Sequence, residues 1–163
     1  MVGQEIVYKT LENLGITFDY IEHPPTPTVE IAKQYWSALE GKKCKNLFFR
    51  NHKGNRHYLV VVDCDKELAI KDLEQMLKQG KLSFASEQRM LKYLGLYPGS
   101  VSPFGLLNDT DNHVYLFLDE NLKHADKLSF HPNDNRASIS LKTEDFVKFL
   151  DFTGNDYEWI KLY

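Results

Sequence analysis

The chain has 163 residues, of which 42% are apolar and 26% charged, a composition that is ordinary for a soluble globular protein. Aromatic residues make up 13%, which argues against disorder, and the net charge of −3 excludes a polybasic protein that holds nucleic acid by its overall charge. No apolar run reaches the ~18–20 residues of a membrane span, and no secretory signal is visible, so we expect a cytoplasmic protein with one domain over residues 1–163.

The first half of the chain predicts helices and strands in alternation. Three prolines within residues 24–27 require a turn, and Thr28 after them is a candidate N-cap. Residues 58–62 form an almost continuous apolar run, which is typical of a central strand. In chain order we expect a helix over 4–14, a strand over 18–22, a helix over about 29–39, strands over 47–50 and 58–62 joined by a turn at 52–55, a short strand at 68–70 and a helix over 71–79.

The second half begins with a helix that Ser86 caps and Gly95 ends, and Thr143 is a candidate cap for a later helix. In chain order we expect a strand at 82–85, a helix from 86 through 94, an irregular loop over 97–105, a strand over 114–118, residues 128–130 leading into a turn at 131–135, a strand over 137–141, a helix from 143 to about 151 and a last strand over 157–162. The irregular alternation predicts a mixed α/β domain rather than a doubly wound parallel sheet.

Three stretches at the ends of strand-like runs are candidates for a site, because rigid scaffolds usually carry their sites there. Lys45 and Asn46 precede the strand predicted to start at Leu47, and offer a positive charge and an amide that both donates and accepts hydrogen bonds. The Gly99–Gly105 loop matches no phosphate-binding pattern, but its glycines let a ligand approach main-chain N–H groups that can stabilise an oxyanion. The pKa of a histidine such as His131 suits proton exchange near neutral pH. Taken singly, a solvated loop, an ordinary connection and a structural histidine also explain these features.

Metal and nucleophile chemistry have little support in the sequence. Neither His-x-x-x-His nor Cys-x-x-Cys occurs, so we expect no metal site and no cofactor. Cys44 lies between two lysines that could lower its pKa, but no base for a thiolate can be placed. Cys44 and Cys64 are expected to be reduced thiols.

Three motifs in order give a resemblance that covers essentially the whole chain. They are Lys-Asn-Leu-Phe, then Leu-Gly-x-x-Pro-Gly-Ser-Val-Ser-Pro-Phe-Gly, then Phe-His-Pro-x-x-Asn. This combination closely resembles the YbaK-like aminoacyl-tRNA editing family and, within it, the free-standing prolyl-tRNA editing branch. The resemblance implies a mixed, curved sheet of about six to seven strands with flanking helices.

The resemblance also implies an activity, namely hydrolysis of the ester between a wrong amino acid and tRNA, with alanine on proline tRNA as the expected substrate. Lys45, Gly99 and His131 match the catalytic positions of the family. The positions implied to bind substrate are Asn46, Ser100, Val101, Ser102, Pro103, Phe104 and Asn135. Arg136 departs from the small and hydroxyl residues that the family commonly carries after this asparagine.

A cationic surface is expected for the tRNA, since phosphate contacts dominate such binding. The candidates cluster around the first hairpin and are Lys42, Lys43, Arg50, Lys53 and Arg56. The expected partners are the acceptor end of mischarged tRNA and, through the resemblance, prolyl-tRNA synthetase; no membrane is expected. Two alternatives stay open: a deacylase for cysteine or another small amino acid on tRNA, and a non-catalytic module that binds tRNA or a synthetase.

Overall fold

In the computed structural model, which describes residues 1–26, 28–35 and 38–162, the frame of the fold is a mixed sheet of eight strands in the order β1-β7-β6-β2-β3-β5-β8, with β4 paired to β2. The strands are β1 (Asp19–Glu22), β2 (Lys42–Arg50), β3 (His57–Asp63), β4 (Ser83–Phe84), β5 (Tyr115–Asp119), β6 (Lys127–Phe130), β7 (Ala137–Lys142) and β8 (Tyr157–Ile160). The helices are α1 (Glu5–Asn13), α2 (Val29–Ala32), α3 (Ile70–Leu77), α4 (Glu87–Leu94) and α5 (Thr143–Thr153), with 3₁₀ helices over Pro103–Asn108 and Glu120–His124. The predicted mixed α/β class is confirmed, and the sheet has one strand more than expected.

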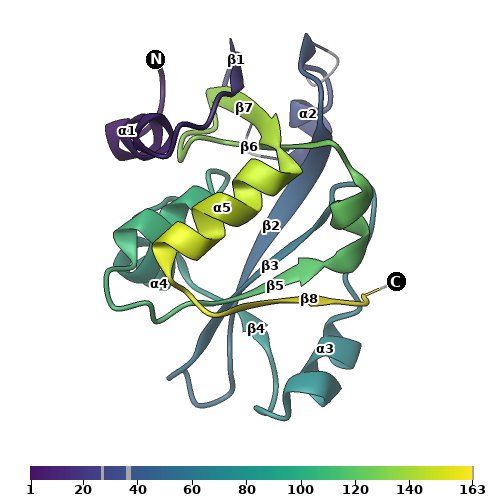
Figure 1. Ribbon diagram of the computed structural model, residues 1–163. Helices are drawn as coiled ribbons and strands as arrows, with labels where there is room; N and C mark the ends of the chain where they lie inside the picture. Colours follow the sequence, from purple (N-terminus) through teal and green to yellow (C-terminus); the bar gives the residue numbers. More distant parts are fainter. Residues whose placement is uncertain (27, 36–37, 163) are drawn as a thin grey trace.

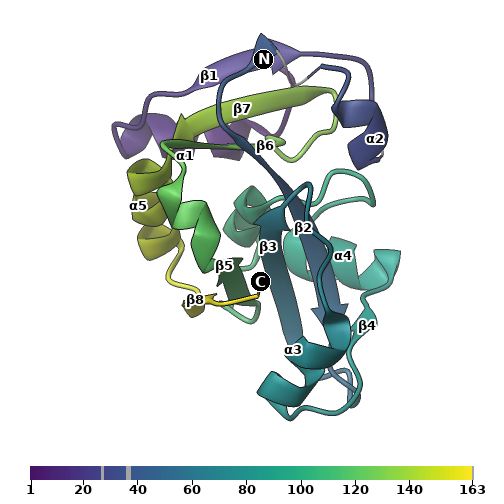
Figure 2. The same ribbon diagram turned by 90° about the vertical axis from the view of Figure 1, so that its right-hand side faces the viewer.

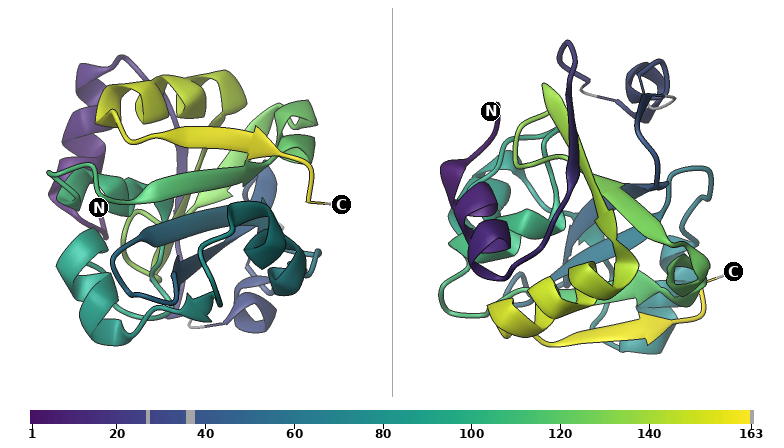
Figure 3. Two further views of the ribbon diagram at one scale, coloured as in Figure 1. Left: turned by 90° about the horizontal axis from the view of Figure 1, so that it is seen from below. Right: turned by 45° about the horizontal axis from the view of Figure 1, so that its top comes forward.

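The sheet is strongly curved and buries a different core on each face. On one face, α1, α4 and α5 cover the sheet, and Leu11, Phe104 and Phe149 are fully buried there (Figure 1). On the other face, Leu73 of α3 belongs to a second core cluster that also contains Val60 of β3. Strands β3, β5 and β8 run side by side, as the left panel of Figure 3 shows.

Strand β2 joins the two halves of the sheet and leaves part of one edge open. Its residues 44–50 pair with β3, which is buried along almost all its residues, as its apolar run predicts. On the other edge, Lys42 and Lys43 pair with β6, whereas Phe49 and Arg50 pair with β4. Among the described residues, no strand pairs with residues 44–47 on that edge, so a gap opens between β6 and β4.

Several predicted boundaries are wrong in ways that have local causes. Strand β2 begins at Lys42, not at Leu47, because pairing with β3 and β6 extends it through the polar residues. No strand forms at 68–70, since α3 begins at Ile70. Helix α2 ends at Ala32; of the rest of the predicted helix, residues 36–37 lie outside the described part of the chain.

Two caps and one loop also test the predictions. Ser86 accepts a hydrogen bond from the Arg89 N–H and Gly95 ends α4, as predicted. Thr143 is not a cap, because it is the first residue of α5 and its hydroxyl donates to the Ala125 carbonyl. The second part of the loop predicted to be irregular forms the 3₁₀ helix that begins at Pro103. In the described part of the chain, every helix is too short or too polar to cross a membrane.

Candidate active site

A cavity of about 290 Å³ opens at the gap in the edge of β2. Figure 2 shows α2, β2, α4 and β4 along the side of the molecule on which it lies. The residues that line it include Lys45 and Asn46 of β2, Gly99 and Val101 of the loop after α4, and His131 after β6. The structure therefore brings the three predicted stretches together, although Lys45 and His131 are 86 positions apart in the sequence.

Lys45 and Asn46 enter the site from a rigid strand. Within the described chain, no carboxylate forms an ion pair with Lys45, so its charge is available to a ligand. The Oδ1 atom of Asn46 is buried and has no hydrogen-bond partner among the described residues. A buried acceptor without a donor is costly, by about 1–3 kcal/mol, and therefore marks a place where a ligand or water can supply the donor.

His131 is held as a neutral ring with a defined proton position. Its Nδ1 lies 2.7 Å from the carbonyl oxygen of Ala137, which can only accept, so the N–H is on Nδ1 and Nε2 remains an acceptor. Burial lowers the pKa of His131 below its ordinary value, and the hydrogen bond to Ala137 opposes that effect. The ring at the cavity wall is therefore neutral near pH 7.

His23 does not line the cavity but supports His131, a role that the sequence did not reveal. Its Nδ1 donates to the Pro24 carbonyl at 2.9 Å, and its Nε2 accepts from the Ser138 hydroxyl at 2.9 Å. Its ring lies edge-on to His131, with 5.9 Å between the ring centroids. Ser138 and His131 are more than 100 residues away from His23 in the sequence, so no local spacing could have indicated these contacts.

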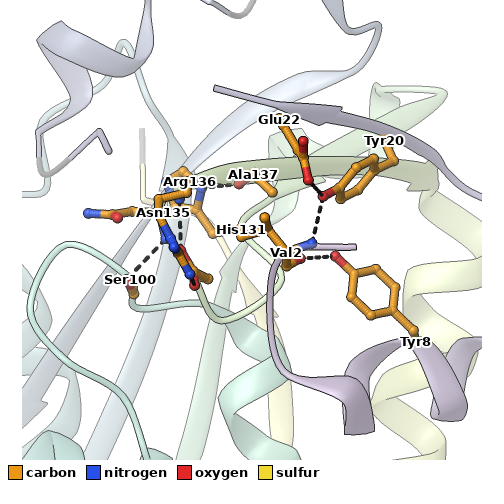
Figure 4. A network of polar contacts seen from close by, with 10 residues as sticks. Val2, Tyr8, Tyr20, Glu22, Ser100, His131, Asn135, Arg136 and Ala137 are labelled. Carbon is orange, nitrogen blue, oxygen red and sulfur yellow. Dashed lines mark hydrogen bonds and ion pairs between the residues drawn. The ribbon is translucent and has the colours of Figure 1, made fainter. Parts of the chain in front are cut away.

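Ser100 and Asn135 connect the loops around the cavity rather than line it. The Asn135 N–H donates to the Ser100 hydroxyl at 3.2 Å (Figure 4). The Asn135 carbonyl accepts from both the N–H and the hydroxyl of Thr26, each at 3.1 Å. Arg136 turns to Asp134 at 2.6 Å and is not a wall of the cavity.

Gly99 lies at the surface of the cavity, whereas the residues after Val101 lie behind its wall. Gly99 lines the cavity with a φ of +85°, a backbone conformation that side chains other than glycine rarely adopt. Ser102, Pro103 and Phe104 lie behind the wall and are buried, and the Phe104 ring packs against Phe149 with 5.0 Å between centroids. Their predicted contact with substrate does not match this placement; they support the loop instead.

The predicted cations fall at opposite ends of β2. Lys42 forms an ion pair with Asp63 at 2.8 Å, and the Lys43 ammonium donates to the Leu39 carbonyl while burial lowers its pKa. Arg50, Lys53 and Arg56 lie at the hairpin end, eight rises of ~3.3 Å or about 26 Å from Lys42. The cations flank the cavity rather than form one patch.

Cys44 cannot serve as an activated thiolate. It is buried, and burial raises the pKa of its thiol far above the usual range, which overturns the expectation that two neighbouring lysines lower it. Both Cys44 and Cys64 are free thiols.

Comparison with known proteins gives agreement over the whole chain. The sequence pattern of the aminoacyl-tRNA editing domain family matches residues 23–149. The chain is 41% identical over 162 residues to the prolyl-tRNA editing protein ProX of Acetoanaerobium sticklandii, with 99% of each chain covered. It is 34% identical over 163 residues to prolyl-tRNA synthetase associated domain-containing protein 1 of Mus musculus, with 96% of each covered. A crystal structure of a candidate trans-editing enzyme for prolyl tRNA synthetase shares the fold with a TM-score of 0.69 at 23% identity, over 98% of this chain and 99% of that one.

Proposed function

Because this chain belongs to the aminoacyl-tRNA editing domain family, we propose that it is a free-standing enzyme that hydrolyses the ester between a wrongly attached amino acid and proline tRNA, with alanine as the preferred amino acid. The names of the bacterial and mouse relatives support proline tRNA. The observation that carries the proposal is the convergence of Lys45, Asn46, Gly99 and His131 on one small cavity.

This hydrolysis requires correct positioning of the reactants and stabilisation of charge more than it requires a covalent nucleophile, because an aminoacyl ester is already activated. The site has to position a water molecule and stabilise the charge that grows on the carbonyl oxygen. In this proposal the main chain at Gly99 and the ammonium of Lys45 hold the ester and stabilise that charge. A hydroxyl of the terminal ribose helps to activate the water, and neutral His131 forms part of the amino-acid pocket.

The side-chain amide of Asn46 is the proposed contact for the substrate's α-ammonium group. Every aminoacyl ester carries this donor, and the Asn46 oxygen has no donor among the described residues. A hydrogen bond to a charged group contributes about 1.5–3 kcal/mol, which is enough to orient the acyl group.

The size of the cavity supports selection of a small amino acid. Its volume of about 290 Å³ is at the lower end of the ~300–1,000 Å³ that is common for ligand pockets. The ester and part of the ribose have to share this space, which leaves little room for a side chain. A pocket that admits alanine and rejects the larger proline ring acts as a second sieve where the first binding step cannot discriminate.

The cations at the hairpin end of β2 are the proposed contacts for tRNA phosphates. Lys53 and Arg56 are exposed, and Arg50 is partly so. By contrast, Lys42 and Lys43 are engaged by Asp63 and the Leu39 carbonyl, so they contribute less.

A panel of tRNAs charged with alanine, cysteine, serine or proline tests the proposal. Wild-type protein should release alanine from proline tRNA fastest. Lys45→Ala should reduce that rate by two orders of magnitude or more, in line with removal of an oxyanion-stabilising group, and Asn46→Leu should also reduce it. Thermal melting should show that both variants remain folded.

The matched control is Lys71→Ala, which removes an exposed lysine on α3, away from the cavity. It should keep full activity. Fastest release of another amino acid would reassign the substrate, and no release from any tRNA would leave a binding module instead of an enzyme. Full activity in Lys45→Ala would refute the role of the lysine.

A further inference from the structure

Phe84 is an exposed aromatic residue at the cavity that the proposed chemistry does not use. It lines the cavity, yet 59% of its surface is exposed. Its ring stacks on Phe49, which is fully buried, with 4.7 Å between centroids and 27° between planes. One face of the Phe84 ring is therefore covered and the other is open to solvent.

The main chain holds this ring in place. Phe84 lies in β4 directly opposite Phe49 of β2, and the next residue, Ala85, donates its N–H to the Phe48 carbonyl at 2.8 Å. Figure 2 shows β4 beside β2 and below α4, and Met90 of α4 also lines the cavity. The open face of the Phe84 ring is thus held in a fixed position and forms part of an apolar rim of the cavity.

The volume of the cavity decides which parts of an aminoacyl-tRNA end fit inside it. About 290 Å³ suits the acyl group and its ester but leaves no room for a purine base as well. The base therefore has to lie at the rim. An aromatic ring with one free face is the residue on which proteins stack an unpaired base, a contact worth about 1–3 kcal/mol.

Resting on the proposed function, we propose that Phe84 stacks on the terminal adenine base of the tRNA and so places the ester bond inside the cavity. The covered face of the ring packs on Phe49, and the open face receives the base. Stacking needs only a π face, so the contact serves any tRNA that ends in the same nucleotide and leaves selection of the tRNA to other surfaces.

The test uses two stable amide analogues of the substrate end. One is 3′-alanylamido-3′-deoxyadenosine, and the other is the same compound without its base. Calorimetry should show that wild-type protein binds the complete compound about five- to 150-fold more tightly, the range that corresponds to one base stack. Phe84→Leu should reduce this ratio to near one, whereas Phe84→Trp should keep it.

Phe152→Leu is the matched control, because Phe152 is 56% exposed on α5, which contributes nothing to the cavity lining. It should bind as wild type does. A wild-type protein that does not prefer the base-containing compound, or binds neither, overturns the proposal, as does a Phe84→Leu variant with an unchanged ratio. The deacylation panel decides the proposed function separately, so the two can fail independently.

Discussion

Individual histidines show how one residue type takes different roles according to the contacts of its ring nitrogens. His131 donates from Nδ1 to a carbonyl and keeps Nε2 as an acceptor at the cavity. His23 has both nitrogens occupied and only supports its neighbour. Both rings carry the proton on Nδ1, since a carbonyl oxygen cannot donate. The roles follow from tertiary partners and not from the residue type.

His57 on β3 is a third case, and its environment affects stability. The Arg89 guanidinium can only donate, so it donates to Nε2 of His57 at 2.9 Å, and Nδ1 donates to Nε2 of His113 at 2.8 Å. Burial first, and then the charges of His113 and Arg89, lower the pKa of His57 to about 4. The fold therefore requires this ring to be neutral.

We expect the free energy of unfolding to fall as the pH drops from about 6.5 toward 4. A histidine in the unfolded chain has a pKa of about 6.5, whereas His57 in the fold has one of about 4. In this window the unfolded chain binds more protons, so acid favours unfolding, and above it the contribution of His57 to stability is complete.

Urea unfolding of the wild type and of His57→Gln, each at about pH 7.5 and about pH 5, measures this effect. The variant should lose less stability than the wild type between the two conditions. Equal losses would show that His57 does not control the dependence on pH.

At the scale of elements, the site depends on a strand whose edge is only partly paired. It also depends on loops that are held by hydrogen bonds from other segments. Strand β2 pairs with β6 and β4 only at its ends, which leaves the gap for the cavity. The loops around it have few regular hydrogen bonds of their own. Side chains and main-chain groups from elsewhere replace these bonds, as Thr26 and Ser100 do for Asn135.

Gln4 forms several of the hydrogen bonds that hold these loops in place. Its Nε2 donates to the Gly95 carbonyl at 3.2 Å, and its Oε1 accepts from the side-chain amides of Asn108 and Asn133, each at 3.0 Å. Its N–H also donates to the Pro132 carbonyl at 3.1 Å. One side chain thus ties the segment that contains Gly99 to the segment that contains His131.

Gln4→Ala should therefore lower both stability and turnover. Removal of a side chain that satisfies three buried or half-buried partners is expected to cost about 1–3 kcal/mol of unfolding free energy. Turnover should fall about tenfold, because small misplacement of catalytic groups is costly to the rate.

Chemical denaturation and steady-state deacylation measure the two effects. Gln75→Ala on α3 changes an exposed glutamine away from the cavity and should affect neither by much. A Gln4→Ala variant that loses stability but keeps wild-type turnover would limit Gln4 to a structural role.

At the scale of the whole molecule, attraction of tRNA has to come from a local group of cations and not from the net charge. The net charge is −3, so the protein as a whole does not attract tRNA. The exposed cations Lys53 and Arg56 lie at one end of β2, where a phosphate backbone could pass beside the cavity. Binding by such contacts releases counterions and therefore weakens as the salt concentration rises.

We expect the logarithm of the tRNA association constant to fall linearly with the logarithm of the salt concentration. The double variant Lys53→Ala with Arg56→Ala should reduce the slope by about one for each phosphate contact that is lost. Filter binding of uncharged proline tRNA over a range of salt concentrations measures it, with Lys71→Ala as control. Wild-type affinity that does not respond to salt would exclude this surface as the tRNA contact.

The sequence by itself determined the class of fold and the stretches that form the site. Apolar periodicity located β3, α1 and α4, because these elements follow from local spacing and from caps such as Ser86 and Gly95. The motifs around Lys45, Gly99 and His131 indicated the family, which the match over residues 23–149 confirms.

Only the tertiary structure decided which of the candidate residues face the cavity. Phe104 and Ser102 belong to a motif in the sequence but are buried behind the wall, whereas Phe84 belongs to no motif and lines the cavity. His23 also belongs to no motif, and it packs against His131. The reason is that burial, proton position and open ring faces depend on partners far away in the chain. Local spacing carries no record of these partners; the pairing of β2 with β3, β6 and β4 brings them together.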